Sequence, residues 1–133
     1  FTYTNYKTIG LKNKNIETPK KFSFKTFTKN TSIATSTMII RRKIAKNVIF
    51  TRTVICEYYF FKCKILKKIN YAYGLNEYLT SYRLRDNSMQ SNKLRNLYWI
   101  WKINNEYNKF NLFQNLVYVT LISLNSIKKY GYR

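Results

Sequence analysis

The sequence contains no histidine, and five of its 133 residues are acidic. Without an imidazole there is no Ser–His or Cys–His catalytic pair, and three glycines leave no glycine-rich phosphate loop. The carboxylates are scattered, so no two form an obvious acid–base or metal-binding pair. They are Glu17, Glu57, Glu77, Asp86 and Glu106. These absences predict that the chain is not an enzyme, with no catalytic residues and no cofactor.

The two cysteines, Cys56 and Cys63, are seven residues apart. On a helix they would lie about 10 Å apart along the axis, too far for a disulfide. A zinc site would need histidines or carboxylates that the chain lacks or nearly lacks. We interpret both cysteines as small apolar side chains and predict no metal site.

Basic residues are abundant: 25 lysines and arginines give a formal net charge of +20. Residues 1–68 hold 16 basic and 2 acidic residues, and residues 69–133 hold 9 and 3. Such an excess repels itself in a compact monomer unless a polyanion compensates it. Nucleic acid is the commonest polyanionic partner. A lysine-rich soluble surface and an anionic membrane surface are the alternatives.

Lys, Asn, Ile, Tyr and Phe supply 70 of the 133 residues, and Ala and Gly three each. This bias indicates an A/T-rich gene, as in organelles and protists. The start Phe-Thr-Tyr-Thr is similar to the pattern left when mitochondrial presequences are removed. We therefore predict a location in the mitochondrial matrix, with the plastid as second choice.

Residues 1–36 show no sustained hydrophobic period, and polar residues dominate them. Such a segment buries too little apolar surface to fold by itself, so we predict an extended basic arm that orders on a partner. The alternation Phe22-Ser-Phe24-Lys leaves a short strand as an alternative.

Residues 37–69 carry apolar side chains at three- and four-residue steps, with basic residues between them. This spacing predicts a long helix with one packed stripe and a basic remainder. The stripe consists of Ile40, Ile44, Val48, Ile55, Tyr59, Cys63 and Leu66. Uncharged runs stay well below the ~20 residues of a membrane span, so no membrane span is expected.

After a break at Gly74, the pattern predicts further helices over 75–85, 93–108 and 112–124, and a short last one from Asn125. Asn87 or Ser91 is expected to cap the second of them. The predicted fold is mainly α: an extended basic N-terminal arm over 1–36, then a helical RNA-binding domain over 37–133, with a long basic helix and a small C-terminal helical domain.

Basic side chains interleaved with aromatic ones are typical of RNA-binding surfaces, where cations meet phosphates and rings stack on bases. Arg41, Arg42, Lys43 and Lys46 place four cations within six residues. The predicted RNA-binding residues are Lys20, Lys21, Arg41, Arg42, Lys43, Lys46, Arg52, Lys62, Lys64, Lys67, Lys68, Arg83, Arg85, Lys93, Arg95 and Lys102.

Residues 85–104, RDNSMQSNKLRNLYWIWKIN, resemble a signature of bacterial large-subunit ribosomal protein twenty. That family carries an Arg-Asp pair, a basic helix and an Arg-x-Leu-Trp-Ile-x-Arg-Ile-Asn core. The matching positions, with Tyr98 as an inserted residue, are Arg85, Asp86, Gln90, Arg95, Leu97, Trp99, Ile100, Lys102, Ile103 and Asn104.

The resemblance implies a ribosomal protein that binds ribosomal RNA through a long basic helix and serves translation. We therefore expect a structural constituent of an organellar ribosome, in the large subunit. Its partners would be ribosomal RNA and neighbouring ribosomal proteins, with no small-molecule substrate. A basic accessory subunit of a mitochondrial inner-membrane respiratory complex is the alternative.

Overall fold

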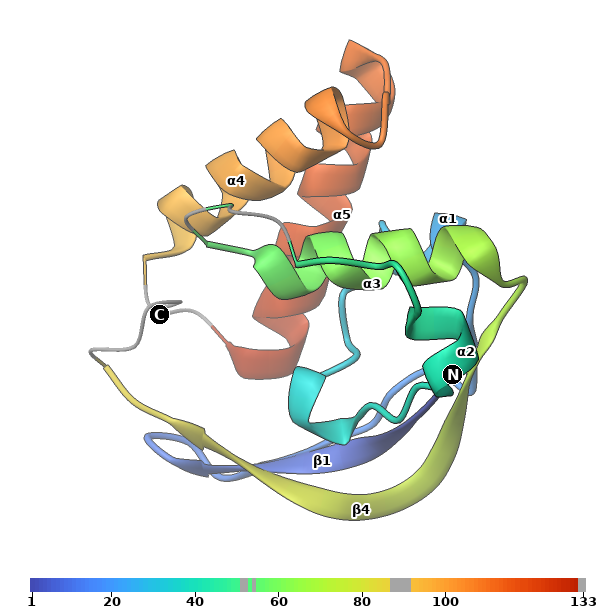
Figure 1. Cartoon of the computed structure of the whole chain (residues 1–133). Helices are drawn as coiled ribbons and strands as arrows, with labels where there is room; N and C mark the ends of the chain where they lie inside the picture. The colour runs from blue at the N-terminus through green and yellow to red at the C-terminus, as the bar shows by residue number, and fades with distance from the viewer. Residues whose placement is uncertain (51–52, 54, 87–91, 132–133) are drawn as a thin grey trace.

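The structure is a computed structural model, which describes residues 1–50, 53, 55–86 and 92–131. A curved sheet lies under a layer of helices (Figure 1). In chain order, the elements are β1 (Thr2–Gly10), β2 (Lys14–Ile16), β3 (Lys21–Phe22), α1 (Phe24–Phe27), the 3-10 turn η1 (Thr35–Thr37), α2 (Arg42–Ala45), α3 (Glu57–Lys68), β4 (Ala72–Leu84), α4 (Lys93–Glu106) and α5 (Leu112–Tyr130). The fold is mixed α/β, so the prediction of a mainly α chain is wrong.

The sheet has the order β2-β1-β4-β3. The strands β1 and β4 form a parallel pair at its centre. Their pairing begins with Thr2 opposite Tyr73 and ends with Gly10 opposite Leu84. Register shifts around Asn5 accompany the curvature that Figure 1 shows in β4. β2 and β3 pair antiparallel at the two edges. The pairing of the first and fourth strands therefore brings together two segments that are some seventy residues apart in the chain.

The helix predicted over 75–85 is instead part of β4. Around Tyr78 and Thr80, half-buried residues alternate with exposed ones, which is the period of a strand. Hydrogen bonding to β1 holds this segment extended, because strand pairing outweighs the weak secondary-structure propensities of the individual residues. Gly74 lies inside the strand, where a Cβ would come within 2.8 Å of the Tyr3 ring and of the Pro19 carbonyl oxygen.

The first 36 residues form three strands and a short helix, not an extended arm. Tyr3 and Tyr6 on β1 and Phe22 on β3 are each 1% exposed. The segment folds because its isolated aromatics are buried against elements that come later in the chain. The short strand left as an alternative around Phe22 and Phe24 is present in part. Phe22 belongs to β3, whereas Phe24 belongs to α1. The division of the chain into domains at residue 36 stays a prediction.

The long helix predicted over 37–69 is also wrong, since among the described residues of this range only Glu57–Lys68 forms a substantial helix. The segment before it holds η1 and the four-residue α2. Asn47 and Cys56 adopt positive φ, and each interrupts a helical path. Tyr59, Cys63 and Leu66 do form the buried stripe of α3 at the expected spacing.

α4 and α5 confirm the helices predicted over 93–108 and 112–124. Asn92 caps α4 by accepting a bond from the Arg95 amide, whereas the expected caps Asn87 and Ser91 lie outside the described residues. Asn111 and Gln114 form a capping box at the start of α5. Asn125 lies within α5, which continues to Tyr130, so no separate last helix exists.

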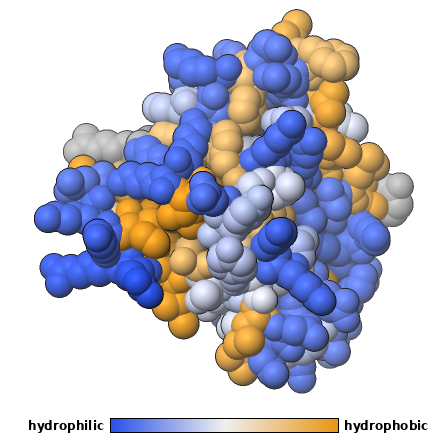
Figure 2. All heavy atoms as spheres, turned by 90° about the vertical axis from the view of Figure 1, so that its right-hand side faces the viewer, coloured by the Kyte–Doolittle hydropathy of each residue, from blue (hydrophilic) through white to orange (hydrophobic). Residues whose placement is uncertain are grey.

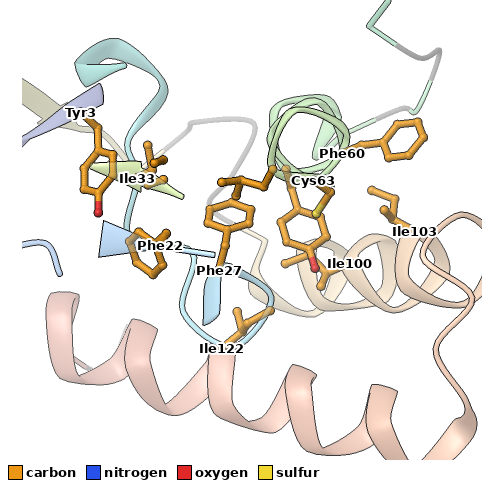
Figure 3. Packing of buried hydrophobic residues seen from close by; sticks show 12 residues of the cluster. Tyr3, Phe22, Phe27, Ile33, Phe60, Cys63, Ile100, Ile103 and Ile122 are labelled. Carbon is orange, nitrogen blue, oxygen red and sulfur yellow. The ribbon is translucent and has the colours of Figure 1, made fainter. Parts of the chain in front are cut away.

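Buried aromatic and aliphatic side chains from the strands and helices meet in one cluster (Figure 3). Phe27 stacks on Tyr59 with ring centroids 5.7 Å apart, which ties α1 to α3. The cluster comprises Tyr3, Phe22, Phe27, Ile33, Tyr59, Phe60, Cys63, Leu66, Ala72, Ile100, Ile103 and Ile122.

A buried polar network fastens the three long helices. The Tyr59 hydroxyl donates to Asn104 Oδ1 at 2.7 Å, and Asn104 Nδ2 donates to Asn115 Oδ1 at 3.1 Å. Asn108 Nδ2 also donates to Asn104 Oδ1, and Asn115 Nδ2 to the Trp101 carbonyl oxygen, both at 3.0 Å. Because buried amides must find partners, this network fixes the angle of the α4–α5 hairpin on α3.

On the face at the right of Figure 1, hydrophilic side chains surround scattered apolar ones (Figure 2). Within the described residues, no helix has the length and apolar character needed to cross a membrane.

A basic, tyrosine-lined cavity as the candidate functional site

A cavity of about 860 Å³ lies between the sheet and the helices. Its walls come from β1, the loop around η1, α3, β4, α4 and α5. Ile33, Ile100 and Ile122, whose inner faces belong to the core in Figure 3, supply apolar wall. The volume is within the range of small-molecule sites. The fold therefore creates a concave site that no single segment of the sequence specifies.

The cavity carries positive charge without negative charge. Lys62, Arg83, Lys93 and Lys129 line it, and no aspartate or glutamate is among the described lining residues. The four cations come from α3, β4, α4 and α5, so tertiary structure brings them together. Anionic groups of a ligand would be attracted to such a surface.

Lys62 is the most deeply placed of these cations, with 6% of its surface exposed. Its Nζ donates to the Ile33 carbonyl oxygen at 2.6 Å, which anchors the η1 loop on α3. Burial lowers the pKa of Lys62 to about 8; the nearby Cys63 thiol opposes this shift, and the charge of Lys129 adds to it. The lowering by Lys129 has the sign expected of a neighbouring positive charge, and both lysines line the same cavity.

Lys129 lies in the last turn of α5, half-buried, beside the ring of Tyr130. Burial lowers its pKa to about 8 as well. Neither Lys62 nor Lys129 has a carboxylate ion-pair partner among the described residues. Two desolvated ammonium groups near each other are costly, and an anion that entered the cavity would relieve that cost.

Five tyrosines and Phe27 form the aromatic part of the described lining. Tyr6 and Tyr130 place their hydroxyl oxygens 2.5 Å apart, which closes one side of the cavity between β1 and α5. Burial, with contributions from Tyr130 and Tyr82, raises the pKa of Tyr6 far above its usual value, so the hydroxyl stays protonated. Tyr58, Tyr59 and Tyr82 complete the set. Rings with polar tips suit a ligand that has both apolar faces and hydroxyl groups.

Cys56, the N-cap residue of α3, lines the cavity. Cys56 has a left-handed backbone with φ 63°, and its thiol donates to the Asn96 carbonyl oxygen at 3.8 Å. Burial and the Glu57 charge raise the pKa of Cys56 to about 11, against a smaller opposite effect of Arg95. The thiol is therefore protonated near neutral pH and is a poor nucleophile. Strained backbone of this kind concentrates at functional sites.

The structure does not gather the predicted RNA-binding residues on one surface. Of the sixteen, Lys62, Arg83 and Lys93 line the cavity. Lys64, Lys67 and Lys68 on α3 donate to the carbonyl oxygens of Ile49, Tyr107 and Lys46 respectively, at 3.2–3.4 Å. These lysines hold neighbouring segments against α3, and intramolecular carbonyl groups take up part of the positive charge.

The remaining predicted residues are dispersed. Lys21 lies over the ring of Tyr71 at 4.7 Å, and Lys102 forms an ion pair with Glu106 at 3.8 Å. Arg42 and Lys43 lie on α2, and Arg95 on α4. Lys20, Arg41, Lys46 and Arg85 are exposed in connecting segments, and Arg52 lies outside the described residues. Their role in binding stays a prediction.

Sequence reasoning missed the tyrosine lining and Lys129. The tyrosines are spread over the whole chain, with no spacing that marks a site. Lys129 was one cation among many near the end of the chain. No local signal separates these residues from their neighbours, because burial around a shared cavity is what distinguishes them.

No family model matches the chain, and no solved structure matches it. The sequence is similar to the putative teichuronic acid biosynthesis glycosyltransferase TuaG of Bacillus subtilis strain 168. The two are 28% identical over 137 aligned residues, which cover 97% of this chain and 53% of TuaG. The chain therefore spans about half the length of the curated relative it matches.

The similarity to TuaG corrects the resemblance to the ribosomal protein twenty family and the functions it implied. The matching positions from Arg95 to Asn104 fall on α4, where Ile100 and Ile103 are buried; Arg85 and Asp86 precede this helix, and Gln90 lies outside the described residues. Any amphipathic helix packed in this way repeats apolar residues at such steps, so the motif reflects helical packing. The expected role in an organellar ribosome is wrong, and nothing favours the respiratory-complex alternative.

The predicted partners need the same correction. The predictions of ribosomal RNA and ribosomal-protein partners, and of no small-molecule substrate, are corrected because the relative that the chain matches is described as a glycosyltransferase. The prediction that the chain is not an enzyme conflicts with this similarity, because the relative is described as an enzyme. The mitochondrial location stays a prediction.

Proposed function

We propose that this chain takes part in glycosyl transfer and that the basic, tyrosine-lined cavity receives a saccharide-bearing substrate. The observation that carries the proposal is the alignment with a glycosyltransferase over 97% of the chain. TuaG is named for the biosynthesis of teichuronic acid. A chain of net charge +20 with a cationic cavity is suited to a negatively charged donor or acceptor.

The lining supports a sugar as the ligand. The hydroxyl groups of Ser81, Ser123 and Ser126 and the tyrosine rings offer polar and apolar surface side by side. Sugars present the same combination, with hydroxyl groups around the ring edge and C–H groups on the ring faces. A few polar groups among apolar ones are typical of a site that orients its ligand.

Glycosyl transfer breaks the bond from the anomeric carbon to its leaving group and forms a bond from that carbon to an acceptor oxygen. The acceptor hydroxyl gives its proton to a base, which is commonly a carboxylate. No carboxylate is among the described residues that line the cavity, so the proposal assigns saccharide binding to the cavity and names no base.

Saccharide binding that depends on the cavity tests the proposal. The purified chain is titrated calorimetrically with a panel of glycosides and nucleotide sugars. Ser126→Trp fills the cavity from α5, and Thr120→Trp adds the same side chain on an exposed part of that helix. We expect the parent and Thr120→Trp to bind a panel member and Ser126→Trp to lose at least tenfold in affinity. Equal affinities in all three proteins, or no binding to any panel member, would contradict the proposal.

A further inference from the structure

The two lysines at the inner end of the cavity have no carboxylate partner among the described residues, although one is buried and the other half-buried. Buried charges in proteins are normally paired or hydrogen-bonded. Lys62 has one such bond, to the Ile33 carbonyl oxygen, and an ammonium group has three donors. The other two N–H donors of Lys62 and the charge of Lys129 could be satisfied by an oxyanion in the cavity.

The dimensions and the rest of the lining decide what carries that oxyanion. A single inorganic ion would fill a small part of about 860 Å³. Tyr6, Tyr59, Tyr82 and Tyr130 supply rings and hydroxyl groups next to the cations. Arg83 on β4 adds a planar donor suited to two oxygens of one carboxylate or phosphate. A ligand that fits this surface has a ring, several hydroxyl groups and one anionic end.

We infer that the cavity takes an acidic saccharide, whose carboxylate or phosphate is held by Lys62 and Lys129. This inference rests on the proposed function and narrows its substrate class. A uronic acid and a sugar phosphate share the required chemistry, and a neutral sugar lacks it. The oxyanion lies at the inner end beside α3 and α5, and the sugar ring lies against the tyrosines.

The test compares ligands that differ in the charged group. The purified chain is titrated near pH 6.5 with methyl β-glucuronide, methyl β-glucoside and glucose 1-phosphate. The first two differ at one carbon, which bears a carboxylate in the glucuronide and a hydroxymethyl group in the glucoside. We expect at least one anionic ligand to bind ten times more tightly than the glucoside. The anionic ligand with the higher affinity shows whether the bound group is a carboxylate or a phosphate.

Substitutions test which residues cause the preference for the anionic ligand. Lys129→Gln should bring the anionic ligand to within about threefold of the glucoside, while Lys128→Gln, an exposed neighbour outside the lining, should keep the preference. Circular dichroism checks that each variant folds, and Arg83→Gln on the exposed edge of the lining should weaken the same preference if Lys129→Gln does not fold.

Glucoside and anionic ligands of equal affinity would overturn the inference and leave the proposed function standing. A preference that survives both Lys129→Gln and Arg83→Gln would also overturn it. Failure of every ligand to bind would overturn both.

Discussion

The hydroxyl oxygens of Tyr6 and Tyr130 lie 2.5 Å apart, joining the first strand to the last turn of the last helix across 124 positions of sequence. Lys12 Nζ and Lys14 Nζ donate to the carbonyl oxygens of Tyr130 and Lys128 at 3.1 Å, beside the tyrosine pair. The segment from β1 to β2 is therefore held against the last turn of α5 at the wall of the cavity. The order of this wall depends on a few polar contacts with residues in the first strands.

Tyr6→Phe removes one hydroxyl from the buried pair. We expect it to lower the free energy of unfolding by about 1 kcal/mol, as for a typical internal hydrogen bond. The double variant with Tyr130→Phe should cost less than the sum of the single variants, because they share one bond. Urea denaturation measures all three, and Tyr82→Phe on the exposed side of Tyr6 is the control. Strict additivity would show that the hydroxyl pair contributes nothing.

Lys62→Met tests the buried ammonium group. The unfolded lysine holds its proton up to about pH 10.5, and the folded one releases it above about pH 8. Between these values the unfolded state binds more protons, so stability rises with pH. The parent should gain about 2 kcal/mol between pH 7 and pH 9.5 through this residue, and Lys62→Met should gain much less.

Urea denaturation of both proteins at the two pH values makes that comparison. Lys129 contributes in the same direction, since burial lowers its pKa to about 8 also, and it is present in both proteins. Burial raises the pKa of Cys63 from 9.0 to about 12, so this thiol opposes the gain as the pH approaches 9, but it does so equally in both proteins. Equal gains in the parent and Lys62→Met would show that the Lys62 amine is not desolvated.

Asn104→Ala removes the centre of the polar network between α3, α4 and α5. The Tyr59 hydroxyl and the Asn115 and Asn108 amides then lose partners in a buried site. We expect a loss of about 2–4 kcal/mol in unfolding free energy, because unsatisfied buried groups keep their full desolvation cost. Asn105→Ala, at the adjacent exposed position, should change it by less than about 0.5 kcal/mol. Similar losses in both variants would refute the role of the network.

Gly74→Ala tests the close approach inside β4. The new Cβ would lie 2.8 Å from both the Tyr3 ring and the Pro19 carbonyl oxygen, and backbone cannot move aside as a flexible side chain does. We expect a loss of about 1–3 kcal/mol, the usual cost of overpacking. Thermal melting measures it, and an unchanged midpoint would mean that β4 shifts freely. Ser81→Ala, exposed on the same strand, is the control.

Residues 93–106 and 112–130 show what sequence determined by itself. Their apolar spacing and asparagine caps are local, so both helices could be predicted, and α3 kept the stripe of Tyr59, Cys63 and Leu66. Cys56 and Cys63 are free thiols, in agreement with the interpretation from their spacing. These features depend on contacts within a few turns of one helix.

The strands and the cavity were decided by tertiary structure. β1 and β4 are weakly patterned, and each becomes a strand because the other supplies its hydrogen-bond partners from some seventy residues away. Lys62, Lys129 and the tyrosines become a site because four elements bring them around one space. Composition gave the sign of the charge, but burial decides which cations are desolvated. Those pairings and that burial depend on long-range contacts, which local spacing in a single sequence does not encode.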